Sequence, residues 1–128
     1  MRALLDTHTL IWALYNEDFL SPQARQLLED PEAEILVSAA SAWEIATKYR
    51  LGKLPEAEEL AQDFLHVVPS SGYTLLAITP EHALRAGRLP GNHKDPFDRM
   101  LAAQAIHEDL TLLSNDTRLD QFAIRRTW

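Results

Sequence analysis

The stretch that decides the fold is His93–Ala105, with the sequence HKDPFDRMLAAQA. It carries two carboxylates, Asp95 and Asp98, on either side of a Pro-Phe pair and then continues into an alanine-rich apolar segment. Asp95 before Pro96 suits a helix N-cap, because its carboxylate can accept a backbone N–H near Asp98 and proline favours the first helical position. We therefore predict a helix that starts at Asp95, approaches a sheet closely through its alanines and holds Asp98 rigidly in its first turn.

The chain has 128 residues and no cysteine, and 46% of its residues are hydrophobic. This length suits one compact domain spanning residues 1–128. The lack of cysteine excludes disulfides, thiolate nucleophiles and cysteine-based metal sites. Asp6 interrupts the N-terminal apolar run, and no segment approaches the roughly 20 uninterrupted apolar residues of a membrane span. We expect a soluble cytoplasmic protein that does not enter a membrane.

The formal net charge of −7 excludes a general nucleic-acid coat protein, because phosphate backbones attract basic surfaces. A metal site built from carboxylates would reverse the local sign, since the bound cations carry positive charge. The net charge therefore does not exclude a phosphate-containing substrate.

Short apolar runs alternate with helical patterns along the chain. The predicted strands lie at residues 2–5, 34–40, 73–79 and 110–116, with a short fifth at 122–128. The first four runs are almost continuously apolar, as expected of strands covered on both faces. Helices are predicted at residues 21–30, 38–52, 57–68, 79–87 and 95–105. This alternation predicts an α/β fold, a three-layer open parallel sheet of four to five strands with helices on both faces.

Acidic residues follow the ends of the predicted strands. Asp6 ends the first strand, Asp116 follows the fourth, and Glu44 lies in the helix after the second. Asp98 begins the helix that leads into the fourth strand, so it opens on the same edge of the sheet. Binding sites of open parallel sheets lie at this edge. Like charges packed there need a counter-charge, which a divalent cation with oxygen ligands, such as Mg²⁺ or Mn²⁺, would supply.

Most of these acids also have a purely structural explanation. Asp98 is favourable against a helix dipole, Glu44 would complete a capping box with Ser41, and Asp116 suits an N-cap. Asp6 is hardest to explain in this way, because a lone carboxylate between two apolar runs is costly to bury. Independent caps have no reason to converge on one edge of a sheet, whereas a metal site requires it.

Four motifs together resemble the PIN-domain ribonucleases, and within them the VapC-type toxins of bacterial toxin–antitoxin pairs. They are DTHTLIWAL at residues 6–14, SAASAWEI at 38–45, DPFDRMLAAQA at 95–105 and LLSND at 112–116. The resemblance covers essentially the whole chain. It implies a catalytic, metal-binding set of four acids, namely Asp6, Glu44, Asp98 and Asp116. It also implies supporting roles for Thr7 and for Ser114, which stands where threonine is common, and we keep Asp95 as a cap or supporting residue.

The resemblance implies endonucleolytic cleavage of RNA that depends on one or two Mg²⁺ or Mn²⁺ ions, with attack on the phosphodiester by a water that the metal activates. It also implies inhibition by a cognate antitoxin, and commonly a homodimer. Lys94, Arg99 and Arg118 flank the acids in sequence and are candidate contacts to the RNA backbone, with solvated surface charge as the equal alternative. The five histidines show no ligand spacing in the sequence.

Three other functions remain open. One is a PIN-like domain that binds its partner but is catalytically weak or inactive. A haloacid-dehalogenase-type phosphatase would need a second aspartate two residues after Asp6, where His8 stands. A receiver-like phosphoacceptor would need an aspartate after the third strand, where Thr79 stands. Metal-dependent cleavage of RNA, with EDTA as the control, separates these possibilities.

Overall fold

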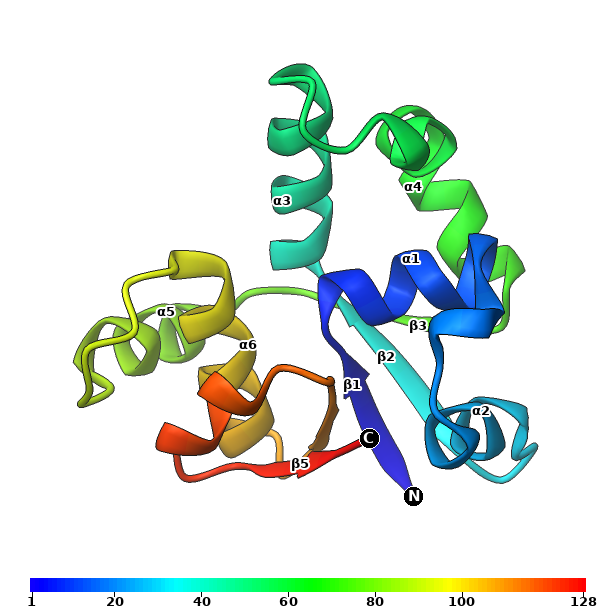
Figure 1. Ribbon diagram of the computed structural model, residues 1–128. Helices are drawn as coiled ribbons and strands as arrows, with labels where there is room; N and C mark the ends of the chain where they lie inside the picture. Colours follow the sequence, from blue (N-terminus) through cyan, green and yellow to red (C-terminus); the bar gives the residue numbers. More distant parts are fainter.

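The computed structural model describes all residues 1–128 and contains a five-stranded sheet with the strand order β3-β2-β1-β4-β5 (Figure 1). Every neighbouring pair of strands is parallel. The strands are β1 (Arg2–Leu5), β2 (Glu34–Ser38), β3 (Thr74–Leu76), β4 (Thr111–Leu113) and β5 (Arg125–Thr127). This arrangement confirms the predicted parallel α/β sheet and brings the carboxyl ends of its strands to one edge.

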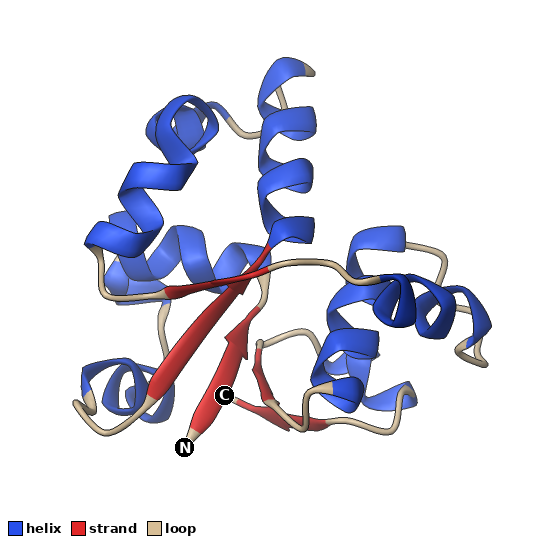
Figure 2. Ribbon diagram, turned by 180° about the vertical axis from the view of Figure 1, so that it is seen from behind, coloured by secondary structure: helices blue, strands red, loops and turns tan.

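Helices pack on both faces of this sheet (Figures 1 and 2). The α-helices are α1 (Thr7–Tyr15), α2 (Pro22–Glu29), α3 (Ala39–Arg50), α4 (Glu58–Ser70), α5 (Pro80–Arg88) and α6 (Pro96–His107). Three short 3₁₀ helices are η1 (Glu17–Phe19), η2 (Pro55–Ala57) and η3 (Thr117–Gln121). None of the helices combines the length and the apolar character needed to cross a bilayer.

Each face of the sheet has its own hydrophobic core. Leu5 of β1 packs in a core shared with α1, α2 and α4. Leu4, the preceding residue, packs in a second core shared with α6, which contributes Leu101 and Ala102. Because Leu4 and Leu5 are both fully buried, β1 is covered on both sides, as its continuous apolar run predicted.

Side chains cap the starts of three helices, and the cap predicted at Asp95 is among them. The Ser21 hydroxyl accepts the Ala24 N–H at 3.0 Å at the start of α2. Thr79 caps α5 in a capping box with His82, and Asp95 caps α6. Each of the three is followed by proline at the first helical position, where a missing N–H removes no helical hydrogen bond.

The capping box of Ser41 and Glu44, the structural alternative for Glu44, does not form. Helix α3 begins at Ala39, and its cap is Ser38, whose hydroxyl accepts the Ala40 N–H at 2.9 Å. Ser41 and Glu44 therefore lie inside the helix, where neither satisfies its first N–H groups. Glu44 is buried and needs another explanation.

The edge strands are shorter and more exposed than the sequence predicted. The third apolar run, residues 73–79, forms only the three-residue strand β3, and Thr74 and Leu75 are exposed. The fifth run, residues 122–128, forms β5 from Arg125 to Thr127. An edge strand pairs on one side only, so its apolar composition does not ensure the burial that a central strand has.

Replacing Ala102 with leucine should destabilise the protein by about 1–3 kcal/mol, because the position is fully buried where α6 packs on the sheet and a larger side chain strains that contact. Ala83→Leu, at an exposed position of α5, is the matched control and should change the free energy of unfolding by less than about 0.5 kcal/mol. Urea unfolding measures both values. Equal stabilities of the two variants would contradict the close approach of α6.

Candidate active site

A polar cleft of about 580 Å³ lies at the carboxyl end of the sheet. It receives side chains from the segments that follow β1, β2 and β4 and from the start of α6. Its lining residues are Asp6, Thr7, His8, Trp12, Glu44, Lys48, Asp95, Asp98, Asn115, Asp116, Thr117 and Arg118. All four acids predicted as metal ligands therefore line one cleft, together with the supporting residues Thr7 and Asp95.

Asp6 lies where β1 ends, and its side chain is also the N-cap of α1. One carboxylate oxygen accepts the backbone N–H groups of His8 at 2.8 Å and Thr9 at 3.4 Å. The other accepts the Ser114 hydroxyl at 2.5 Å. The residue is only 9% exposed. Burial raises the pKa of Asp6, although these hydrogen bonds and the nearby His8 favour its charged form.

Ser114 connects two of the acids. Its hydroxyl donates to Asp6 and accepts the backbone N–H of Asp116 at 3.0 Å. Thr7 makes a comparable link on the other side, since its hydroxyl lies 3.0 Å from that of Ser41 in α3. These contacts hold α1, α3 and the segment after β4 in fixed positions around the cleft. Ser114 lines no part of the cleft itself, which agrees with a supporting position.

Asp98 is held by a histidine. His93 Nε2 lies 2.7 Å from Asp98 Oδ2, and both side chains are largely buried. Asp95 accepts the N–H groups of Phe97 at 2.9 Å and Asp98 at 3.3 Å, which confirms it as the cap of α6. Burial raises the pKa of Asp98 to about 6; the His93 hydrogen bond opposes this shift, while the charges of Asp95 and Asp6 add to it.

The two remaining acids each have a cation as partner. Lys48 Nζ lies 2.5 Å from Glu44 Oε2. Arg118 binds Asp116 through two guanidinium nitrogens, with Nη2 at 2.7 Å from Oδ2. The hydrogen bond from Arg118 lowers the pKa of Asp116. In the cleft, Asp6 and Asp98 therefore resist ionisation, whereas Glu44 and Asp116 are ion-paired.

The three cations proposed as RNA contacts differ in their positions. Lys94 is exposed beside the start of α6, and Arg118 lies on the cleft with 71% of its side chain exposed. Arg99 does not fit the predicted role, because its guanidinium nitrogens donate to the backbone carbonyls of Ala86, Leu89 and His93. These hydrogen bonds connect α6 to the end of α5 and to the loop that follows α5.

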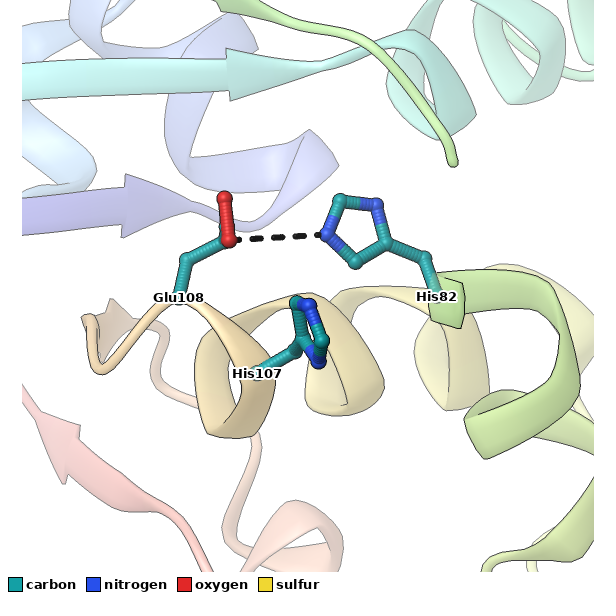
Figure 3. Close-up of side chains that lie close together, drawn as sticks. All are labelled: His82, His107 and Glu108. Carbon is teal, nitrogen blue, oxygen red and sulfur yellow. Dashed lines mark ion pairs between the residues drawn. The ribbon is translucent and has the colours of Figure 1, made fainter. Parts of the chain in front are cut away.

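Outside the cleft, His82, His107 and Glu108 bring three possible ligand atoms within 4.8 Å of one another (Figure 3). No spacing in the sequence indicated this group, because the two histidines come from different helices. His82 Nε2 is buried without a hydrogen-bond partner, 3.8 Å from Glu108 Oε2. The Thr79 N–H, however, donates to His82 Nδ1 at 3.0 Å. Neutral His82 therefore carries its proton on Nε2, where a metal would need a lone pair, so this group is not a prepared metal site.

Comparison with known proteins places this geometry in a family. The profile of the PIN domain matches residues 3–125. This chain belongs to the PIN domain family. Among its relatives, ribonuclease VapC22 of Mycobacterium tuberculosis is 32% identical over 121 residues, which are 91% of this chain and 88% of that protein. Ribonuclease VapC16 of the same organism is 41% identical over 68 residues, or 53% of this chain and only 38% of that relative's length.

The fold of this PIN domain is also similar to solved structures. The crystal structure of VapBC2 from Rickettsia felis, bound to a DNA fragment from its promoter, aligns with a TM-score of 0.72. The alignment covers 99% of this chain and 98% of that chain at 17% sequence identity. This likeness concerns the fold and agrees with the family assignment.

Lys48 is the main cleft residue that the sequence analysis missed. It stands four residues after Glu44 in α3, and side chains at this spacing lie on the same helix face. The spacing could have identified it once Glu44 was proposed as a ligand. Asn115 and Thr117 also line the cleft and flank Asp116 in sequence.

Without divalent ions, the PIN domain should become more stable as the pH falls from about 6 toward 3.8. The raised pKa of Asp98 means that the folded chain binds a proton over this range while the unfolded chain has released it, so acidification favours the folded state. The raised pKa of Asp6 acts in the same direction. Thermal melts in EDTA measure the effect as the difference between the wild type and Asp98→Asn, which cancels the other titrating groups. An identical pH profile for both proteins would contradict it.

Substitutions at Asp95, the cap of α6, should show whether its side chain stabilises the fold as a hydrogen-bond acceptor or through its charge. Asp95→Asn should leave the melting temperature nearly unchanged, because asparagine accepts the same N–H groups. Asp95→Ala should lower stability by about 0.5–2 kcal/mol, since those groups lose their acceptor. Chemical denaturation of the two variants provides the comparison. A loss in the asparagine variant as large as in the alanine variant would show that Asp95 stabilises the fold through its charge.

Proposed function

We propose that this PIN domain is a divalent-metal-dependent endoribonuclease and the toxin of a toxin–antitoxin pair. The observation that carries the proposal is that four separate segments direct carboxylates into one cleft, where burial raises the pKa of Asp6 and Asp98. A protein gains nothing in stability from like charges held together in this way, so the arrangement implies a cation that is bound during function. The ribonuclease names of the relatives support this reading.

The cleft fits Mg²⁺ or Mn²⁺ as the bound ion, in one or two positions. Its acidic donors are all oxygens, which these ions prefer. The proposed ligands are Asp6, Glu44, Asp98 and Asp116. No three acids of the cleft bring oxygens within 4.8 Å of one another, so an ion held there would reach some of them through its waters. When bound, the ion would lower the pKa of a coordinated water and offset charge on the phosphodiester.

The residues around the acids would keep the site in one geometry. Ser114 and the backbone N–H groups of α1 fix both oxygens of Asp6. His93 holds Asp98 through the 2.7 Å contact of Nε2 with Oδ2, and its side chain is largely buried. Fixed ligands matter because small displacements of a reacting group reduce the rate strongly. Lys94 and Arg118 are the cations that could contact the RNA backbone from the rim.

An antitoxin and a second copy of this chain are the proposed protein partners. The Rickettsia felis structure is named as VapBC2, a pair rather than a single protein, which supports an antitoxin. Large apolar side chains are exposed on four of the helical segments and are candidates for a partner surface. They include Tyr15, Phe19, Trp43 and Leu65.

The protein should cleave RNA only when Mg²⁺ or Mn²⁺ is supplied, and EDTA should abolish the cleavage. Asp6→Asn and Asp98→Asn should each reduce cleavage by more than about 100-fold, since residues that only support metal ligands already contribute roughly 10–100-fold. Asp95→Asn removes the same charge at the start of the same helix and should retain substantial cleavage. Gel assays with a structured RNA measure all three variants.

Each contrary result has its own meaning. Cleavage that persists in EDTA would reject the metal-dependent mechanism. Hydrolysis of small phosphomonoesters in place of RNA would identify a phosphatase, and the lack of both activities would favour a domain that only binds its partner. If folded Asp95→Asn is as inactive as Asp98→Asn, Asp95 belongs among the ligands.

A further inference from the structure

The side chain of Lys48 occupies the cleft that the proposed metal would enter. Its Nζ lies 2.5 Å from Glu44 Oε2, one helical turn earlier in α3. The Glu44 side chain is 5% exposed and that of Lys48 is 30% exposed, so the pair closes the inner wall of the cleft and keeps the ammonium in contact with water. Glu44 accepts no other hydrogen bond, which makes Lys48 its sole charge partner.

The charges around Lys48 explain its position. Five carboxylates line the cleft against two permanent cations, Lys48 and Arg118. Arg118 is directed to Asp116 at the exposed rim. Partial burial disfavours the charged form of Lys48, but Glu44, Asp95 and Asp98 overcome this and raise its pKa. Lys48 is therefore the cation that offsets the inner acids.

A lysine suits this task better than an arginine because its ammonium is a compact charge on a flexible stem, without the rigid fork that holds a carboxylate at two points. The Lys48 ammonium holds Glu44 through one oxygen, so it can leave Glu44 without breaking a two-point contact. Arg118 forms the two-point contact with Asp116 and has no such freedom.

We propose that Lys48 exchanges partners during function: it neutralises Glu44 in the metal-free protein, and when a divalent ion takes Glu44 it turns to a phosphate of the bound RNA. The inference rests on the proposed function, because it assigns the acids of the cleft to a metal. The exchange gives Lys48 two roles, as a competitor of the metal for Glu44 and as a residue that binds a phosphate of the RNA. Neither role follows from the sequence motifs or from the four acids. Metal and RNA would then bind cooperatively, since the ion releases the cation that the RNA needs.

The first experiment measures Mn²⁺ binding by calorimetry in the absence of RNA. Lys48→Met removes the charge while keeping the length of the side chain, and it should bind Mn²⁺ roughly tenfold more tightly than the wild type, the effect of removing one positive charge a few ångströms from the ion in a hydrated cleft. Lys48→Arg keeps the charge and should not show this gain. Lys53→Met, the same substitution at an exposed position beyond α3, controls for net charge and should bind Mn²⁺ like the wild type.

The second experiment measures RNA binding by fluorescence anisotropy with Ca²⁺ in place of Mn²⁺, after a gel has shown that the RNA stays intact. Lys48→Met should bind the RNA more weakly than Lys53→Met, and its logarithmic salt dependence should be shallower by roughly 0.7, the contribution of one contact to a single-stranded phosphate. Circular dichroism checks that each variant is folded.

The outcomes distinguish this inference from the proposed function. If wild-type protein does not bind Mn²⁺, the proposed function fails and the exchange fails with it. If the wild type binds Mn²⁺ but Lys48→Met binds it no more tightly, only the exchange is overturned. Tighter Mn²⁺ binding with unchanged RNA affinity also overturns it, because Lys48 would then be a counter-ion without a second partner.

Discussion

The structure depends on keeping several carboxylates together at the carboxyl end of a parallel sheet. Parallel strands all end on the same edge, so the acids that follow β1, β2 and β4 cannot avoid one another. In the metal-free protein each of the four proposed ligands is stabilised by a different kind of partner. The partners are the Ser114 hydroxyl for Asp6, Lys48 for Glu44, His93 for Asp98 and Arg118 for Asp116. Helix α3 carries Lys48, η3 carries Arg118, and the segments before α6 and after β4 carry His93 and Ser114.

Three of the cleft acids also organise the fold. Asp6 caps α1, Asp95 caps α6 and Asp116 caps η3, each by accepting backbone N–H groups. The unpaired N–H groups at a helix start carry partial positive charge, which reduces the repulsion between nearby carboxylates. Structural and chemical explanations of these residues are therefore not alternatives, since a carboxylate has about four lone-pair sites and can accept a backbone N–H while it also faces the cleft.

The sequence predicted most of the fold because its central strands are continuous apolar runs and its helices begin with Ser-Pro, Thr-Pro and Asp-Pro. It also predicted that four acids would meet at one edge of the sheet, from their residue type, their places relative to the predicted strands and helices, and the resemblance to the PIN domains. It failed where neighbours outside the local segment decide the outcome. Strand β3 lies exposed at an edge, and the Arg99 guanidinium donates to backbone carbonyls. The spacing of Lys48 to Glu44 could have identified that pair, whereas His93 became recognisable as the partner of Asp98 only in the fold.

The contact of Arg99 with three carbonyls limits where this chain can accept an insertion. Surface loops usually tolerate insertions, because their backbone makes few fixed contacts. The loop between α5 and α6 is different, since Arg99 ties Ala86, Leu89 and His93 to α6 and Gly91 has a φ of 108°, which side chains rarely adopt. An added residue there would shift the ring of His93 away from Asp98. Changes in length are better accommodated at the opposite end of the sheet, in the exposed turn at residues 30–33, where an inserted peptide or a new chain terminus would leave the cleft undisturbed.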